Sequence, residues 1–194
     1  MDGHLVSFMR WLGEFTHDEL YLYGILFMSP FLSRQRFWYY IVAVSLAAFC
    51  KINLKMILSE PRPVFVWADM SPLGCSSSFG SPSGHSTNSA NLCWLIILDL
   101  FFASEWSQRK HSNLNRFTPR SHMLLFVFTS LLAISYWLLV IYNRVFLGRH
   151  TLNQIILGSQ LGIWTAFFSH FVLRDSVFSH ITKLTHKVGT LTSS

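Results

Sequence analysis

Two long stretches of this sequence contain no charged side chain, Met123–Tyr142 and Thr151–Leu173. A helix needs about 20 consecutive apolar residues to cross the hydrocarbon core of a bilayer, and both stretches have this length. Charged residues make up only 12% of the chain, whereas soluble domains average about 25%. Because charged groups are costly in hydrocarbon, this composition favours an integral membrane protein over a soluble protein with a large core.

Three weaker apolar segments precede these two. Asn88–Ala103 is interrupted only by Asp99. Phe37–Cys50 reaches the length of a span if its helix continues through Ile52–Leu58. Leu20–Ser33 has only 14 uncharged residues, so it is the weakest candidate. We therefore predict an all-α fold, a polytopic membrane helical bundle with about five transmembrane helices and a range of four to six.

The charge pattern of the loops predicts an orientation for one membrane-embedded domain over residues 1–194. With five spans, one face receives nine basic and two acidic loop or tail residues. By the positive-inside rule this face, with the C-terminus, is cytoplasmic, in a multi-pass protein of the endoplasmic reticulum or plasma membrane. The basic residues lie between apolar runs and form no stripe with interleaved aromatics, so no nucleic-acid partner is expected.

Cysteine usage adds little, because Cys50, Cys75 and Cys93 have neither the pattern of a disulfide framework nor the spacing of a zinc site. Asp99, inside an apolar segment, has two readings. Intramembrane acids are often functional, but a structural position at the cytoplasmic end of its helix, near Glu105, is favoured here.

Three short polar motifs follow or precede the apolar segments on the opposite face. They are Lys55 with Arg62-Pro63, the run Gly80-Ser-Pro-Ser83-Gly84-His85, and Arg144 with His150. In the second motif, proline and serine are typical of a helix start, where backbone N–H groups and the helix dipole favour an anion. Taken singly, the motifs also fit snorkelling interfacial cations, a capped helix start and a basic turn.

Together, the order Lys-x6-Arg-Pro, Pro-Ser-Gly-His and Arg-x5-His resembles the three signatures of the type 2 phosphatidic acid phosphatase superfamily. This superfamily includes lipid phosphate phosphatases, dolichyl diphosphate phosphatase, glucose-6-phosphatase and vanadium haloperoxidases. The resemblance extends from about Leu54 to Gln154, with the motifs within residues 55–154. It implies a phosphatase, and the charge pattern of the loops predicts that the site faces the lumen or exterior.

The resemblance implies a role for each motif residue. His150 corresponds to the nucleophile that becomes a phosphohistidine, and His85 to the general acid that later activates water. Fixed positive groups stabilise the transferring phosphoryl group, so neither metal nor other cofactor is expected. The implied phosphate-binding residues are Lys55, Arg62, Arg144 and, through their backbone N–H groups, Ser83 and Gly84.

The sequence departs from the superfamily pattern at two positions. Asn143 replaces the usual serine before Arg144, and Gln154 replaces the usual aspartate four residues after His150. Glucose-6-phosphatase and dolichyl diphosphate phosphatase are similar at the second position. A glutamine carbonyl can accept the hydrogen bond of the imidazole without the charge of a carboxylate, so we expect Gln154 to orient His150.

The favoured function is therefore hydrolysis of a phosphate monoester or diphosphate, with a lipid phosphate or diphosphate as substrate. A lumenal sugar-phosphate phosphatase is the alternative, since the stretch Arg62–Trp67 looks somewhat like glucose-6-phosphatase. A non-catalytic membrane scaffold of the same fold is the third reading. The substrate and the oligomeric state are left open by the sequence.

Overall fold

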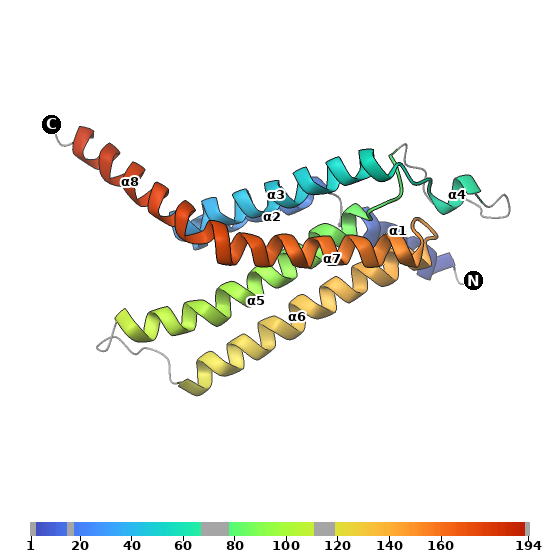
Figure 1. The fold of residues 1–194 in the computed structure, drawn as a ribbon. Helices are drawn as coiled ribbons and strands as arrows, with labels where there is room; N and C mark the ends of the chain where they lie inside the picture. The colour runs from blue at the N-terminus through green and yellow to red at the C-terminus, as the bar shows by residue number, and fades with distance from the viewer. Residues whose placement is uncertain (1–2, 15–17, 67–77, 111–118, 193–194) are drawn as a thin grey trace.

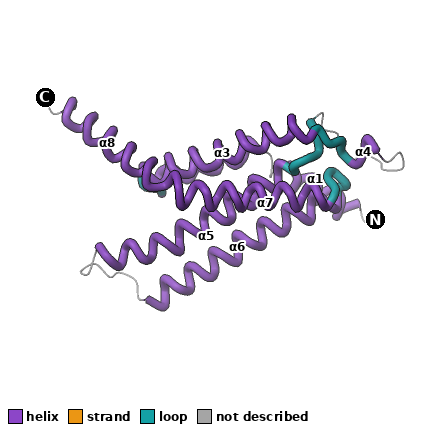
Figure 2. The backbone as a smooth tube through the Cα atoms, viewed as in Figure 1, coloured by secondary structure: helices purple, strands orange, loops and turns teal. Residues whose placement is uncertain are grey.

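A computed structural model describes residues 3–14, 18–66, 78–110 and 119–192 (Figure 1). Every regular element in these residues is a helix (Figure 2), so the predicted all-α fold is confirmed. The predictions that concern Trp67, Cys75 and the basic loop residue Arg116 lie outside the described residues. In chain order the elements are α1 (Gly3–Glu14), α2 (Asp18–Met28), η1 (Ser29–Phe31), α3 (Arg34–Leu58), α4 (Pro63–Val66), α5 (Gly84–Lys110), α6 (Pro119–Phe146), α7 (Leu152–Phe168), η2 (Ser169–Leu173) and α8 (Arg174–Thr192).

Three helical segments in the described part of the chain are long and apolar enough to cross a membrane: Arg34–Val66, Met123–Phe146 and Leu152–Lys187. They contain the two uncharged stretches and the segment that begins at Phe37. The count of five spans stays a prediction, because α2 has only 11 residues and α5 carries a polar first half. The structure also has a helix that the hydropathy pattern did not predict, α1.

Helix α3 has clear signals at both ends. The Ser33 side chain caps its start by accepting a hydrogen bond from the backbone N–H of Arg36. At its end Ser59 adopts the left-handed conformation, with φ of 48°, and donates its N–H to the Lys55 carbonyl at 3.0 Å. The helix therefore continues past Cys50 to Leu58, which is the longer of the two predicted forms.

Helices α5 and α7 pack closely because two glycines remove side chains from their interface. A Cβ atom at Gly158 would lie 2.5 Å from the Ser83 carbonyl oxygen, and one at Gly162 would collide with the Thr87 carbonyl. Small residues four apart allow such close approach of two helices in a membrane. The Asn91 side chain completes the contact by donating to the Thr165 hydroxyl at 2.9 Å. This interface places the starts of α5 and α7 side by side.

Asp99 joins three helices far from the motifs. Its carboxylate pairs with Arg36 at 3.2 Å and with Arg174 at 3.5 Å, and it accepts a hydrogen bond from the Tyr40 hydroxyl at 3.4 Å. The carboxylate is buried, so these partners offset its cost of desolvation. Asp99 therefore links α3, α5 and α8, and its contacts agree with a structural position.

The motif-bearing segments gather at one end of the bundle (Figure 1). The end of α3, the start of α5 and the turn between α6 and α7 lie at this end, together with α1 and α4. Helix α8 projects from the opposite end. The long helices thus act as a frame that brings together polar residues about 100 positions apart in sequence.

Candidate active site

The first motif brings two cations to two neighbouring loop residues, Ser78 and Phe79. Lys55 lies in the last turn of α3, and its Nζ donates to the Phe79 carbonyl at 3.2 Å. Arg62 follows the left-handed residue Ser59, and its Nε and Nη2 donate to the carbonyl and hydroxyl of Ser78 at 2.9 and 2.8 Å. Their spacing of seven residues is near two helical turns, but the helix ends between them at Leu58. The turn of the chain makes the two side chains converge.

The second motif forms the start of α5. The Ser83 carbonyl accepts hydrogen bonds from the backbone N–H and the hydroxyl of Thr87, both at 3.0 Å. Ser83 is therefore the residue at which the helix begins, followed by Gly84 and His85 in its first turn. The N–H groups of a first turn have no partner within the helix, so they can receive an anion.

One expectation for this motif needs correction. The backbone N–H of Ser83 was expected to point at phosphate, but it donates to the Gln154 carbonyl at 2.9 Å. It is engaged because α7 packs closely against α5 at this level. The part of Ser83 in phosphate binding then depends on its hydroxyl, which accepts a hydrogen bond from the Ser86 hydroxyl at 3.0 Å.

The third motif is a tight turn between α6 and α7. Arg144 lies in the last turn of α6 and is fully buried, and its Nη2 donates to the Gly13 carbonyl at 3.0 Å. Gly148 has φ of 63°, a conformation that glycine adopts without a steric penalty. Through this turn His150 arrives next to Thr151, the residue that caps the start of α7.

Gln154 connects all three motifs. Its Oε1 lies 3.3 Å from His150 Nδ1 and also accepts from the Thr151 N–H at 3.3 Å. Its Nε2 donates to the Pro61 carbonyl at 3.0 Å, beside Arg62. A Cβ atom at Gly80 would lie 2.6 Å from the same Nε2, so the glycine leaves room for the amide. The hydrogen bond expected between Gln154 and His150 is present in the structure.

His150 is buried in a strongly positive environment. Burial lowers the pKa of its imidazole to about 3, and the nearby charges of Arg62, Lys55 and Arg144 act in the same direction. The hydrogen bond with Gln154 acts in the opposite direction. His150 is therefore neutral at physiological pH, and the three predicted phosphate-binding cations lie near it.

A fourth cation was missed by the sequence analysis. The charge of Arg149 acts on both Arg62 and Arg144, so its guanidinium belongs to the same cluster. Its N–H donates to the Arg144 carbonyl at 3.2 Å, within the turn. Its position immediately before His150 was the available signal. In the described residues, no group of three or more His, Cys, Asp or Glu side chains comes together as a metal site would require.

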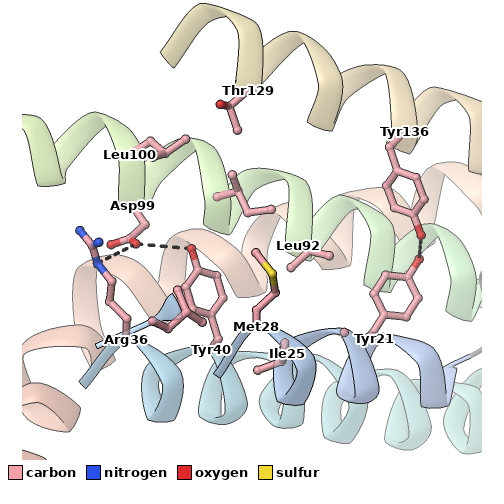
Figure 3. Close-up of a pocket in the computed structure, with 13 residues that line it drawn as sticks. Tyr21, Ile25, Met28, Arg36, Tyr40, Leu92, Asp99, Leu100, Thr129 and Tyr136 are labelled. Atoms are coloured by element: carbon pink, nitrogen blue, oxygen red, sulfur yellow. Dashed lines mark hydrogen bonds and ion pairs between the residues drawn. The ribbon is translucent and has the colours of Figure 1, made fainter. Parts of the chain in front are cut away.

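A partly open apolar chamber of about 510 Å³ lies between α2, α3, α5 and α6 (Figure 3). At one end the hydroxyls of Tyr21 and Tyr136 are hydrogen-bonded at 3.0 Å, and both tyrosines interact electrostatically with Arg144. At the other end lies the ion pair of Arg36 with Asp99 (Figure 3). The walls between are mainly apolar, and include Ile25, Met28, Leu92, Ile96 and Leu100.

The arrangement of motifs was compared with known proteins. The sequence profile of the PAP2 superfamily matches residues 36–177. The chain belongs to the PAP2 superfamily. The match begins in α3 and ends in α8, so it includes all three motifs and the resemblance predicted from them is confirmed.

A solved structure supports the same fold. It is the crystal structure described as the first transmembrane PAP2 type phosphatidylglycerolphosphate phosphatase from Bacillus subtilis. The two proteins are 22% identical with a TM-score of 0.66, and the similarity covers 87% of this chain and 76% of the other. A comparison with curated protein sequences gave no match. This chain is thus an integral membrane protein with the PAP2 fold.

Proposed function

We propose that this PAP2 protein is a phosphatase that hydrolyses a phosphate monoester or diphosphate of a lipid. Membership of the superfamily and the fold shared with a transmembrane phosphatase support this proposal. The observation that carries it is the cluster of Lys55, Arg62 and Arg144 around one buried, neutral histidine. Such a cluster fits a phosphoryl group, whose oxygens need several fixed cations while phosphorus needs an uncharged nucleophile.

The hydrogen bonds of Gln154 support one nitrogen of His150 as the nucleophile. Because Nε2 of Gln154 donates to the Pro61 carbonyl, its Oε1 is the atom that faces His150. An oxygen accepts, so Nδ1 of His150 carries the proton and Nε2 carries the free electron pair. In the proposed mechanism Nε2 is therefore the nucleophile.

The proposed reaction has two steps. In the first, His150 Nε2 forms a bond to phosphorus, the bond to the leaving oxygen breaks, and His85 gives its proton to that oxygen. In the second, His85 takes a proton from water, the water oxygen bonds to phosphorus, and the P–N bond breaks. Inorganic phosphate and neutral His150 are restored. Lys55, Arg62, Arg144 and Arg149 stabilise the equatorial oxygens in both steps.

The apolar chamber favours a lipid over a sugar phosphate. Arg144 and Tyr136 are eight residues apart on α6, a rise of about 12 Å along the helix. The chamber thus begins about two helical turns from the phosphate site, and its apolar walls suit a hydrocarbon chain better than a sugar. We assign it to one hydrocarbon chain of the substrate.

A substrate panel tests this function. Purified protein in detergent should release phosphate from phosphatidate or a polyprenyl diphosphate faster than from glucose 6-phosphate. Release should be unchanged by a metal chelator and inhibited by vanadate, because cations of the protein itself hold the phosphate. Preference for glucose 6-phosphate would favour the sugar-phosphatase alternative. Restoration of lost activity by Mg²⁺ would contradict the metal-independent mechanism, and inactivity on every substrate would favour the scaffold.

We further propose that the site faces the lumen or exterior and the C-terminus faces the cytoplasm. The count of nine basic against two acidic residues supports this orientation. In sealed microsomes, protease added outside should remove a C-terminal tag and leave the segment from Ser76 to Ser81 uncut. A protected tag with a cut segment would reverse the orientation.

A further inference from the structure

Helix α1 accepts two hydrogen bonds from residues near the end of α6. The Gly13 carbonyl accepts a hydrogen bond from Arg144 Nη2 at 3.0 Å. One turn earlier, the Met9 carbonyl accepts from Asn143 Nδ2 at 2.6 Å. All four residues are buried, and neither α1 residue lies in the part of the chain that matches the PAP2 profile. Two consecutive motif residues are thus tied to a helix about 130 positions away in the sequence.

The chemistry of this contact suits an arginine that must keep one orientation. Gly13 is one residue from the end of α1, so its carbonyl lies in the last turn of the helix. The helix dipole adds negative charge at this end, which attracts a guanidinium. The Nη2–H bond to Gly13 directs one side of the guanidinium toward α1, and a guanidinium carries five N–H donors in a fixed fork.

Asn143 provides the second hydrogen bond of this contact with α1. It stands where the superfamily motif usually has serine, and its longer side chain carries the amide that reaches Met9. The same side chain lies against Gly13, because a Cβ atom there would be 3.4 Å from Asn143 Oδ1. The departure from the motif and the contact with α1 therefore belong to one structural feature.

We propose that α1 is a positioning element of the active site, which holds the Arg144 guanidinium in the orientation that binds the phosphoryl group. The proposal rests on the phosphatase function proposed above. In it, Gly13, Met9 and Asn143 do not touch substrate and act through Arg144. The oxygens of the transferring phosphoryl group need their cations in place before the reaction, so a small rotation of Arg144 lowers the rate.

Gly13→Ala is the test variant, with Gly3→Ala as its matched control. A Cβ atom at Gly13 would lie 3.3 Å from Arg144 Nη2, whereas at Gly3 it meets nothing within 4 Å. Both changes replace a glycine of the same helix by alanine, and thermal unfolding checks that both variants fold. Gly13→Ala should lower kcat/KM by about 10-fold, in the range found when an orienting partner is lost, and weaken vanadate inhibition. Gly3→Ala should leave both unchanged.

A double-mutant cycle shows whether the effect passes through Arg144. In an Arg144→Lys background there is no Nη2 to displace, so Gly13→Ala should cost less than 2-fold. Asn143→Asp keeps the shape of the side chain but loses the donor to Met9. It should likewise lower kcat/KM in the wild-type background and cost less than 2-fold in the Arg144→Lys background. An equal loss in both backgrounds, or full activity of Gly13→Ala, would overturn the proposal.

Phosphate binding separates this inference from the proposed function. The affinity of the full chain for inorganic phosphate, from its protection against thermal unfolding, needs no turnover. Gly13→Ala should weaken this affinity and Gly3→Ala should not, even if no substrate of the panel is hydrolysed. If Gly13→Ala and the unmodified chain bind phosphate equally and the enzyme is active, only the role of α1 is refuted. If they bind phosphate equally and the protein is inactive, the role of α1 and the phosphatase function are both refuted.

Discussion

Replacing His150 with alanine should reduce phosphate release by about 10⁴-fold or more, as loss of a catalytic nucleophile does in other hydrolases. The structure gives a reason for so large an effect. Burial and three cations keep the imidazole neutral, so it attacks phosphorus without losing a proton first. In the described residues, His85 is the other histidine of the three motifs, and its proposed task is proton transfer. The measurement is the initial rate, together with acid-labile ³²P on the protein after quenching.

His85→Ala provides the contrast for this experiment. With a substrate whose leaving group needs no proton, such as p-nitrophenyl phosphate, His85→Ala should still form the labelled protein but hydrolyse it slowly. His150→Ala should form no label with any substrate. Rapid turnover by His150→Ala, or label that survives the change, would mean that a different side chain is the nucleophile.

The fold could be predicted from the sequence because lipid imposes a simple rule. A long apolar stretch must be helical, so α6 and α7 were visible in Met123–Tyr142 and Thr151–Leu173. The short helices were harder. Helix α1 mixes polar and apolar residues over 12 positions, and its place is decided by contacts of Met9 and Gly13 with the distant end of α6. Hydropathy within a window contains no such information.

The site could be predicted as a set of residues but not as a geometry. The order and spacing of the motifs identified His150, Arg144 and their partners through the superfamily resemblance. Spacing did not reveal that the Ser83 N–H is taken by Gln154, because this depends on the close packing of α5 on α7. It also did not include Arg149, whose relevance comes from the fold of the turn around Gly148.

Gln154→Leu should lower kcat/KM by about 10- to 100-fold, the usual cost of losing a partner that orients a reactive side chain. Leucine has a similar size but can neither accept from His150 nor donate to Pro61. The imidazole then loses the hydrogen bond that directs Nε2 to phosphorus. The first and third motifs also lose a direct link. The measurement is kcat/KM in detergent, with thermal unfolding to check that the variant folds.

Gln154→Glu should change the pH dependence rather than only the rate. Glutamate keeps the length of the side chain and an acceptor for His150, but its carboxylate cannot donate to the Pro61 carbonyl. At present the pKa of His150 is about 3, so the imidazole stays neutral and nucleophilic in acid. A carboxylate would favour the imidazolium and raise this pKa. Activity should then fall as pH decreases through the new value, and the acid limb of kcat/KM should move to higher pH.

Gln160 offers a matched control, because it is an exposed glutamine on the same helix. Gln160→Leu should keep both the rate and the pH profile. If Gln154→Leu also keeps them, the 3.3 Å contact with His150 has no catalytic consequence and the imidazole is oriented by its burial alone. If Gln154→Glu loses activity equally at all pH values, the bond from the amide to Pro61 is the important one. Gln154 would then hold the motifs together without setting the charge of the nucleophile. The two variants together separate these roles, because leucine removes both hydrogen bonds and glutamate removes only the donated one.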